Sequence, residues 1–169
     1  MSPSSTPVAG ERLAILAFTL ADRHFALRAS DVREIVRAVA IASLPRAPAI
    51  VEGVVNYRGA IVPVLDVRAR FGLAAEPLHP SQHFILAHAG PRLVALRVEQ
   101  ADALVEVERH LVEPAAVAPG AQYVAGIARL PDGLLVIHDL ATFLSLDEGA
   151  AVDAALAPGP SPSPGAAGP

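Results

Sequence analysis

Short apolar runs, each broken by a polar turn, follow one another along most of the chain. The runs are rich in Val, Ile and Leu, and Gly, Pro, Asn or Asp residues bound them. This pattern is typical of short β-strands rather than of helices. The predicted strands cover residues 13–20, 25–27, 32–36, 41–44, 54–55, 60–62, 83–87, 93–98 and 103–107, with a last hairpin after residues 123–125.

The clearest hairpin lies in the stretch Gly53–Leu73, GVVNYRGAIVPVLDVRARFGL. Its polar turn, Asn56-Tyr57-Arg58-Gly59, separates two apolar arms, and both Asn and Gly tolerate the positive φ angles of tight turns. The turn therefore predicts Arg58 at an exposed tip. Pro63 in the second arm has no N–H to donate, which predicts an edge strand or a bulge at that point.

Two short helical segments are predicted around this hairpin. Asp66 has the place of an N-cap and Gly72 that of a C′ residue, which predicts one helical turn between them. Upstream, residues 48–52 begin with proline, which is favoured in the first turn of a helix, and predict a second short helix.

The same plan recurs near the end of the chain, in Gly126–Leu144. Gly53 and Asp66 are 13 residues apart, as are Gly126 and Asp139. Gly53, Gly59, Gly126 and Gly133 are the expected structural turn glycines of the two copies, and Phe71 and Phe143 fall in matching places. The repeat predicts two β units of similar plan. Each unit has about five candidate strands, enough for a small barrel.

The ends of the chain have a different composition. Residues 1–11 are polar, and residues 149–169 are mostly Ala, Gly, Pro and Ser, so both are predicted to be disordered. Two prolines in residues 76–80 mark the crossing between halves. The predicted organisation is one domain, residues 12–148, with halves of about 13–75 plus closing strands and 82–146.

Charge and composition exclude several classes of protein. The net charge is −4 with both signs interspersed, which disfavours a nucleic-acid surface. The chain has no Cys, so it forms neither disulfides nor thiolate metal sites. Neither a secretory signal nor an apolar run of membrane-spanning length is present, so a cytoplasmic protein without membrane insertion is expected.

Candidate catalytic or metal-binding residues are few. The sequence contains no Gly-rich phosphate loop, no GxSxG and no HExxH motif, and we expect no cofactor. His79 and His83 are four apart, but prolines bound their segment and disfavour a helix that would pair them. Glu106 and Glu108 share a strand face typical of solvated edge charges. The alternatives are another β-barrel binding module, or a metal-binding or enzymatic barrel that uses surface histidines.

The ordered motifs resemble the CheW-like family of chemotaxis coupling proteins. The resemblance covers about residues 13–146. It is carried by the Asn-x-Arg-Gly turn, the following Val62-Pro-Val-Leu-Asp-Val-Arg68 and Phe71, and the Val32-Arg-Glu-Ile35 segment. Tyr57 departs from the family's usual Leu. The resemblance implies an all-β fold of two SH3-like five-stranded β-barrels side by side, with short helical turns.

The resemblance also implies a non-enzymatic adaptor that joins chemoreceptor tips to a histidine autokinase in a receptor array. By this comparison the receptor-facing residues are Val32, Glu34, Asn56, Tyr57 and Arg58, and Glu34 forms an ion pair with Arg58. An apolar groove between the barrels would take a receptor helix. The barrel ends would meet the kinase's regulatory domain.

Overall fold

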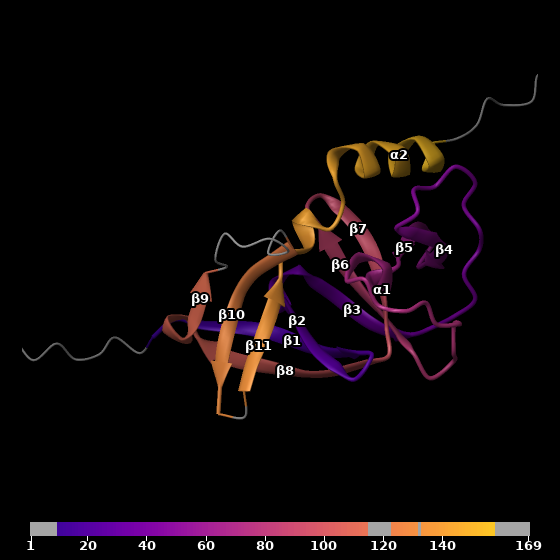
Figure 1. The fold of residues 1–169 in the computed structure, drawn as a ribbon. Coiled ribbons are helices and arrows are strands. Elements are labelled where there is room, and N and C mark those ends of the chain that lie inside the picture. Colours follow the sequence, from indigo (N-terminus) through magenta and orange to yellow (C-terminus); the bar gives the residue numbers. More distant parts are fainter. Residues whose placement is uncertain (1–9, 115–122, 132, 158–169) are drawn as a thin grey trace, which may run out of the picture.

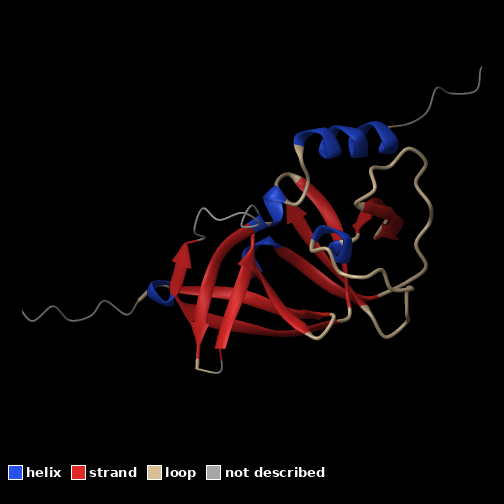
Figure 2. Ribbon diagram, viewed as in Figure 1, coloured by secondary structure: helices blue, strands red, loops and turns tan. Residues whose placement is uncertain are grey.

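The strands of the computed structural model form two curved sheets that lie side by side (Figures 1 and 2). The structure describes residues 10–114, 123–131 and 133–157. The first sheet has the order β8 (Gln100–Glu108), β1 (Arg12–Leu20), β2 (Arg23–Arg28), β11 (Gly133–His138), β10 (Val124–Leu130), β9 (Val112–Pro114). The second has the order β3 (Val32–Arg37), β6 (His83–Ala89), β7 (Arg92–Val98), β5 (Ala60–Leu65), β4 (Val51–Tyr57).

Short helical segments connect or cap the strands: η1 (Ala29–Asp31), α1 (Val67–Arg70), η2 (Arg109–Leu111), η4 (Leu140–Thr142) and α2 (Leu146–Leu156).

Each sheet curls around a small apolar core of its own. In the six-stranded sheet, side chains from β1, β2, β8, β10 and β11 meet in one cluster: Ile15, Ala26, Val107, Ala128, Leu135 and Ile137. In the five-stranded sheet, β4, β5, β6 and β7 supply the cluster Val55, Val62, Val64, Phe84, Leu86 and Ala95, with Val36 of β3 packed against it. Because nearly all strands of a sheet face the same few residues, each sheet is a small barrel. The all-β, two-barrel prediction is confirmed, with six strands rather than five in the first barrel.

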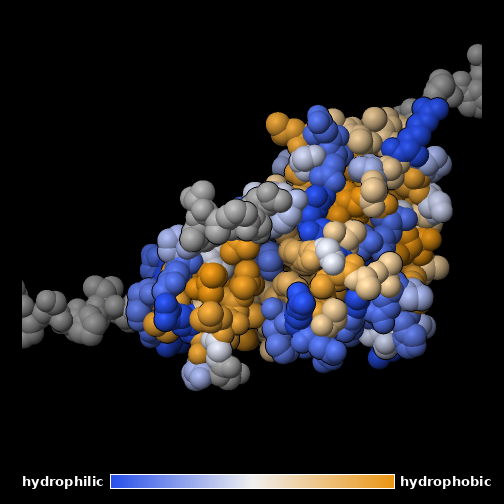
Figure 3. Space-filling view, in the orientation of Figure 1, coloured by the Kyte–Doolittle hydropathy of each residue, from blue (hydrophilic) through white to orange (hydrophobic). Residues whose placement is uncertain are grey.

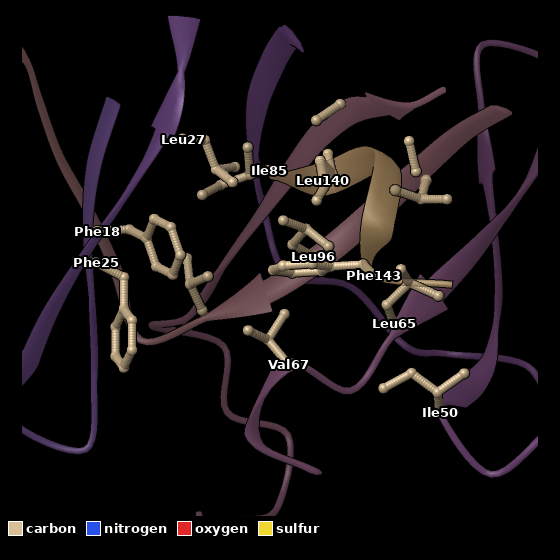
Figure 4. Close-up of a cluster of buried hydrophobic side chains, with 14 of the residues drawn as sticks. Phe18, Phe25, Leu27, Ile50, Leu65, Val67, Ile85, Leu96, Leu140 and Phe143 are labelled. Atoms are coloured by element: carbon tan, nitrogen blue, oxygen red, sulfur yellow. The ribbon is translucent and has the colours of Figure 1, made fainter. Parts of the chain in front are cut away.

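A third and larger core joins the two barrels. Along β1, Ile15 points into the first barrel while Leu16, Phe18 and Leu20 point out of it. Along β6, Ile85 likewise points away from its own barrel. Figure 4 shows the outward side chains of both barrels packed on one another around Phe143. We call this cluster, which includes Leu16, Phe18, Leu20, Ile85 and Phe143, the central core. It joins the two barrels into one unit.

The barrels do not correspond to consecutive halves of the chain. β1 and β2 belong to the barrel that is otherwise built from β8–β11, and β6 and β7 belong to the barrel of β3–β5. Each copy of the repeat therefore gives its first hairpin to the other copy's barrel. The predicted division into residues 13–75 and 82–146 was wrong, because the alternation that marks a strand does not say which strand it pairs with.

The two glycines that open the repeat copies have equivalent places. The strand register shifts by one residue just before Gly53 in β4 and just before Gly126 in β10. A Cβ at Gly53 would lie 2.2 Å from the carbonyl oxygen of Ala42, and one at Gly126 would lie 2.9 Å from that of Glu113. Both glycines therefore permit close crossing of a neighbouring backbone, and neither is at the turn itself.

Three local predictions need correction. Residues 41–44 form no strand, since only Ala42 makes a bridge, to Val54. Residues 48–52 form no helix: one turn, closed by the Val51 N–H on the Pro48 carbonyl, leads directly into β4. Pro63 lies in an interior strand and not at an edge. It fits there because the parallel ladder between β5 and β7 begins only at Val64.

The predicted helical turn after the first hairpin is confirmed. Asp66 is the N-cap of α1, and its carboxylate accepts a hydrogen bond of 3.1 Å from the Ala69 N–H. Gly72 follows with φ +67°, a conformation that glycine adopts at little cost.

The chain remains ordered beyond residue 148, which corrects the prediction of a disordered tail from residue 149. Ser145 and Glu148 form a capping box that begins α2. Val152 is fully buried in the central core, and Asp153 lies 2.6 Å from Arg92 on β7. Residues 1–9 and 158–169, the rest of the predicted disordered ends, lie outside the described residues.

Because α2 packs on the central core through Val152, loss of this contact is expected to destabilise the protein. Val152→Ala should lower the free energy of unfolding by about 1.5 kcal/mol, the value of two buried methyl groups, and lower Tm by several degrees. Thermal melts measure this, and Ala154→Ser, at an exposed position of the same helix, is the control. An unchanged Tm for Val152→Ala would mean that α2 adds nothing to the fold.

Candidate functional site

The predicted site lies at the tip of the β4–β5 hairpin. Arg58 and Gly59 form its two-residue loop, with φ of +50° and +84°, as a type I′ turn requires. The side-chain oxygen of Asn56 accepts a hydrogen bond of 2.9 Å from the Gly59 N–H. The turn is thus closed from within, and Arg58 projects from a rigid base. In the second copy, Gly133 pairs with Leu130 across the corresponding turn.

Glu34 of β3 reaches this tip from the opposite edge of the same barrel. Its carboxylate lies 3.0 Å from the Arg58 guanidinium, so the predicted ion pair is present. The Tyr57 hydroxyl donates a hydrogen bond to the same carboxylate oxygen. Since β3 and β4 are the two edge strands of the sheet, these contacts close the barrel where no backbone ladder does.

The ion pair is accessible from solvent. The side chain of Arg58 is 69% exposed and that of Glu34 is 35% exposed. The Arg58 guanidinium also lies over the Tyr57 ring, with 5.2 Å from its carbon to the ring centroid. The hydrogen bond to Glu34 is the main cause that raises the pKa of Tyr57, while Arg58 opposes it, so the hydroxyl keeps its proton as donor.

The structure thus brings Glu34, Tyr57 and Arg58 together, with Asn56 supporting the turn. Val32 is separate: it packs against the central core, because a β-bulge between Val32 and Glu34 turns them to different sides of β3. The central core fills the contact between the two barrels with apolar side chains. The apolar groove for a receptor helix stays a prediction.

Sequence reasoning missed an apolar hollow at the mouth of the first barrel. It has a volume of about 340 Å³ and lies between β1, β2 and β8 on one side and the β10–β11 hairpin on the other. Leu134 at its rim is 67% exposed, and Figure 3 shows apolar residues gathered on this part of the surface. Strands that are distant in the sequence line the hollow, so periodicity along one strand gives no signal for it.

Sequence reasoning also treated the histidines as surface residues, whereas His138 at the end of β11 is buried. Phe25, Phe71 and Phe143 surround its ring at centroid distances of 5.3, 4.5 and 6.2 Å. Burial is the main cause that lowers the pKa of His138 to about 4, and the backbone of Tyr123 opposes this shift. The internal repeat could have indicated this burial. Its offset of 73 residues makes His138 the equivalent of Leu65, which is buried.

Within the described part of the chain, no group of three His, Cys, Asp or Glu side chains is arranged to hold a metal ion. None of the helices in the described ranges combines the length and the apolar character needed to cross a bilayer.

A rigid pair of barrels that exposes an ion pair at one sheet edge and an apolar hollow at a barrel mouth has the form of a scaffold protein. Residues 14–148 match the CheW-like domain family, and the chain belongs to this family. It is therefore a non-enzymatic scaffold protein of chemotaxis.

Named relatives agree with this assignment. The chain is 28% identical to the chemotaxis protein CheW of Klebsiella aerogenes over 151 residues, which cover 86% of this chain and 91% of that protein. It is 33% identical to CheW of Rhizobium meliloti over 100 residues, 59% of this chain and 64% of that one. The crystal structure of the scaffolding protein TtCheW from Thermoanaerobacter tengcongensis matches with a TM-score of 0.75 and 26% identity, covering 82% of this chain and 96% of that chain.

Proposed function

We propose that this protein couples chemoreceptors to a chemotaxis histidine kinase, with Glu34, Tyr57 and Arg58 at the receptor contact. The observation that carries the proposal is the exposed ion pair across the two edge strands. It is held in place by Tyr57 and by the Asn56-closed turn, so a partner meets preorganised charges. Preorganised charges fix the register of a docked partner and discriminate against wrong ones.

The kinase contact is assigned to the mouth of the first barrel. An exposed Leu134 beside an apolar hollow suits a partner that buries apolar side chains, as the kinase's own CheW-like regulatory domain would. This hollow lies on the other barrel from the ion pair, so one molecule has room for a receptor and a kinase together. Many such weak contacts in an array add up to stable assembly.

The coupler is placed in the cytoplasm and recruited to membrane-associated arrays through the receptors. The proposal requires neither nucleic acid nor insertion into the membrane.

Removal of either partner of the ion pair is expected to weaken receptor binding without unfolding the protein. Arg58→Ala and Glu34→Ala should each raise the Kd for a cytoplasmic chemoreceptor fragment from the source organism about tenfold, or ~1.4 kcal/mol. An exposed ion pair contributes only about 0–1 kcal/mol to folding, so Tm should change by a few degrees at most. Titration by calorimetry, with melts alongside, measures both.

The chain offers a matched control. Arg129 and Glu113 form an ion pair of 2.6 Å with side chains 64% and 56% exposed, on the other barrel. Arg129→Ala should bind receptor as the wild type does, and kinase binding without receptor should be unchanged in Arg58→Ala and Glu34→Ala. Wild-type receptor affinity in Arg58→Ala and Glu34→Ala, or collapse of the fold in either, would make the hairpin merely structural.

A further inference from the structure

The outward face of β3 carries a second surface beside the ion pair. Along this strand Arg33, Ile35 and Arg37 are exposed, while the residues that alternate with them are partly buried. We call Arg33, Ile35 and Arg37 the β3 stripe. It lies on an edge strand, and Ile35 is 40% exposed although its cross-strand neighbour Ile85 belongs to the central core.

The arginines of the stripe differ from most others in the protein. All thirteen basic residues are arginines, and nine of them lie within an ion pair: Arg12, Arg28, Arg58, Arg68, Arg70, Arg92, Arg97, Arg109 and Arg129. Arg33 and Arg37 have no carboxylate partner among the described residues. Within the described part of the chain, the two guanidinium groups on either side of the exposed Ile35 are therefore open to carboxylates of a partner.

The chemistry of this surface selects an acidic partner with one apolar side chain between its charges. A guanidinium group binds a carboxylate through two parallel hydrogen bonds, which gives geometry as well as attraction. Arg33 and Arg37 are four positions apart along β3, a span of at most roughly 13 Å. Seven or eight residues of an α-helix rise about 10–12 Å, so carboxylates on a helix at that spacing meet both arginines, and the residue at the fourth position meets Ile35.

We propose that the β3 stripe binds the acidic face of a receptor helix, with a carboxylate on each side of one apolar residue. This inference rests on the proposed receptor contact and names the chemistry of the segment that docks there. Glu34 is already engaged by Tyr57 and Arg58, so the attraction for the helix comes from Arg33 and Arg37.

The probe is a synthetic α-helical peptide that carries Glu, Leu and Glu at positions i, i+4 and i+8, titrated into the full chain and followed by NMR. The backbone signals of residues 33–37 are expected to shift. Arg33→Gln/Arg37→Gln should weaken binding about tenfold, and rising salt should weaken it further because the charges are exposed. Arg23→Gln, at an exposed arginine on β2 of the other barrel that also has no ion-pair partner among the described residues, should bind as the wild type does.

Charge reversal separates a specific contact from general attraction. The Arg33→Glu/Arg37→Glu variant should reject the Glu peptide and bind a Lys-Leu-Lys peptide of the same spacing. Equal binding of a Gln-Leu-Gln peptide to the wild type would overturn the inference. So would co-sedimentation of the chain with phosphatidylglycerol vesicles that depends on both arginines while the Glu peptide does not bind, since the stripe would then serve a lipid surface.

The receptor fragment distinguishes this inference from the proposed function. If Arg58→Ala weakens receptor binding but Arg33→Gln/Arg37→Gln does not, the receptor contact stands and the stripe is excluded from it. If the Glu peptide binds the stripe and the receptor fragment ignores Arg58, the acidic-helix site stands and the receptor contact at the ion pair is wrong.

Discussion

Gly53→Ala is expected to destabilise the protein by about 3 kcal/mol, because the added methyl group has no room. Its carbon would lie 2.2 Å from the carbonyl oxygen of Ala42 and 2.6 Å from a side-chain carbon of Ile41. Either segment 41–42 or β4 must move. That movement breaks the two backbone hydrogen bonds between Ala42 and Val54, of 2.8 and 2.9 Å. Urea unfolding measures the loss.

Alanine substitutions at two other glycines should be less destabilising and serve as comparisons. Gly126→Ala meets the backbone of Glu113 at 2.9 Å, a milder contact, and should cost less than Gly53→Ala. Gly90 has φ +63° but open space around it, so Gly90→Ala should cost only about 1–2 kcal/mol from the backbone conformation. If Gly53→Ala were as mild as Gly90→Ala, the crossing at Ala42 would be free to give way, and the repeat glycines would have no packing role.

The wild type is expected to lose about 3 kcal/mol of unfolding free energy through His138 as the pH falls from 6.5 to 4. His138→Leu is expected to avoid this loss. The imidazole has a pKa of 6.5 in the unfolded chain and about 4 in the fold, where burial penalises its charge. The unfolded state therefore takes up a proton first. The neutral ring's share of stability is complete above pH 6.5 and is lost as pH falls toward 4, at up to ~1.4 kcal/mol for each pH unit.

Leucine is the replacement that the repeat itself supplies, since Leu65 holds the equivalent buried position in the other barrel. Neither ring nitrogen of His138 finds a hydrogen-bond partner of good geometry among the described residues. The variant should therefore be at least as stable as the wild type at pH 7, because it no longer buries unpaired polar atoms.

Urea unfolding at a series of pH values between 4 and 7 measures the difference in unfolding free energy between the wild type and His138→Leu. His88→Gln, at an exposed histidine of β6, should follow the wild-type curve. Parallel curves for the wild type and His138→Leu across this range would mean that the imidazole is solvated or paired in the fold.

Much of the candidate site could be predicted from the sequence because its determinants are local. The Asn56-to-Gly59 turn follows from residues that accept positive φ, and the Asp66 cap follows from its distance to the helix. The Glu34–Arg58 ion pair came from the family resemblance, since nothing in the spacing brings β3 to the hairpin. The β3 stripe was present in the sequence as alternating residues, but its lack of carboxylate partners became visible only in the fold.

The sequence by itself determined the strands, the hairpin turns, the internal repeat and the family, because alternation and turn chemistry act within a few residues. The tertiary structure decided which strands share a barrel, and it placed α2 and His138 in the central core. Backbone ladders pair any two strands equally well, and β1 and β6 are apolar on both faces, so their local pattern fits more than one partner. Only the packing of all the side chains together selects the arrangement in which each copy of the repeat gives its first hairpin to the other copy's barrel.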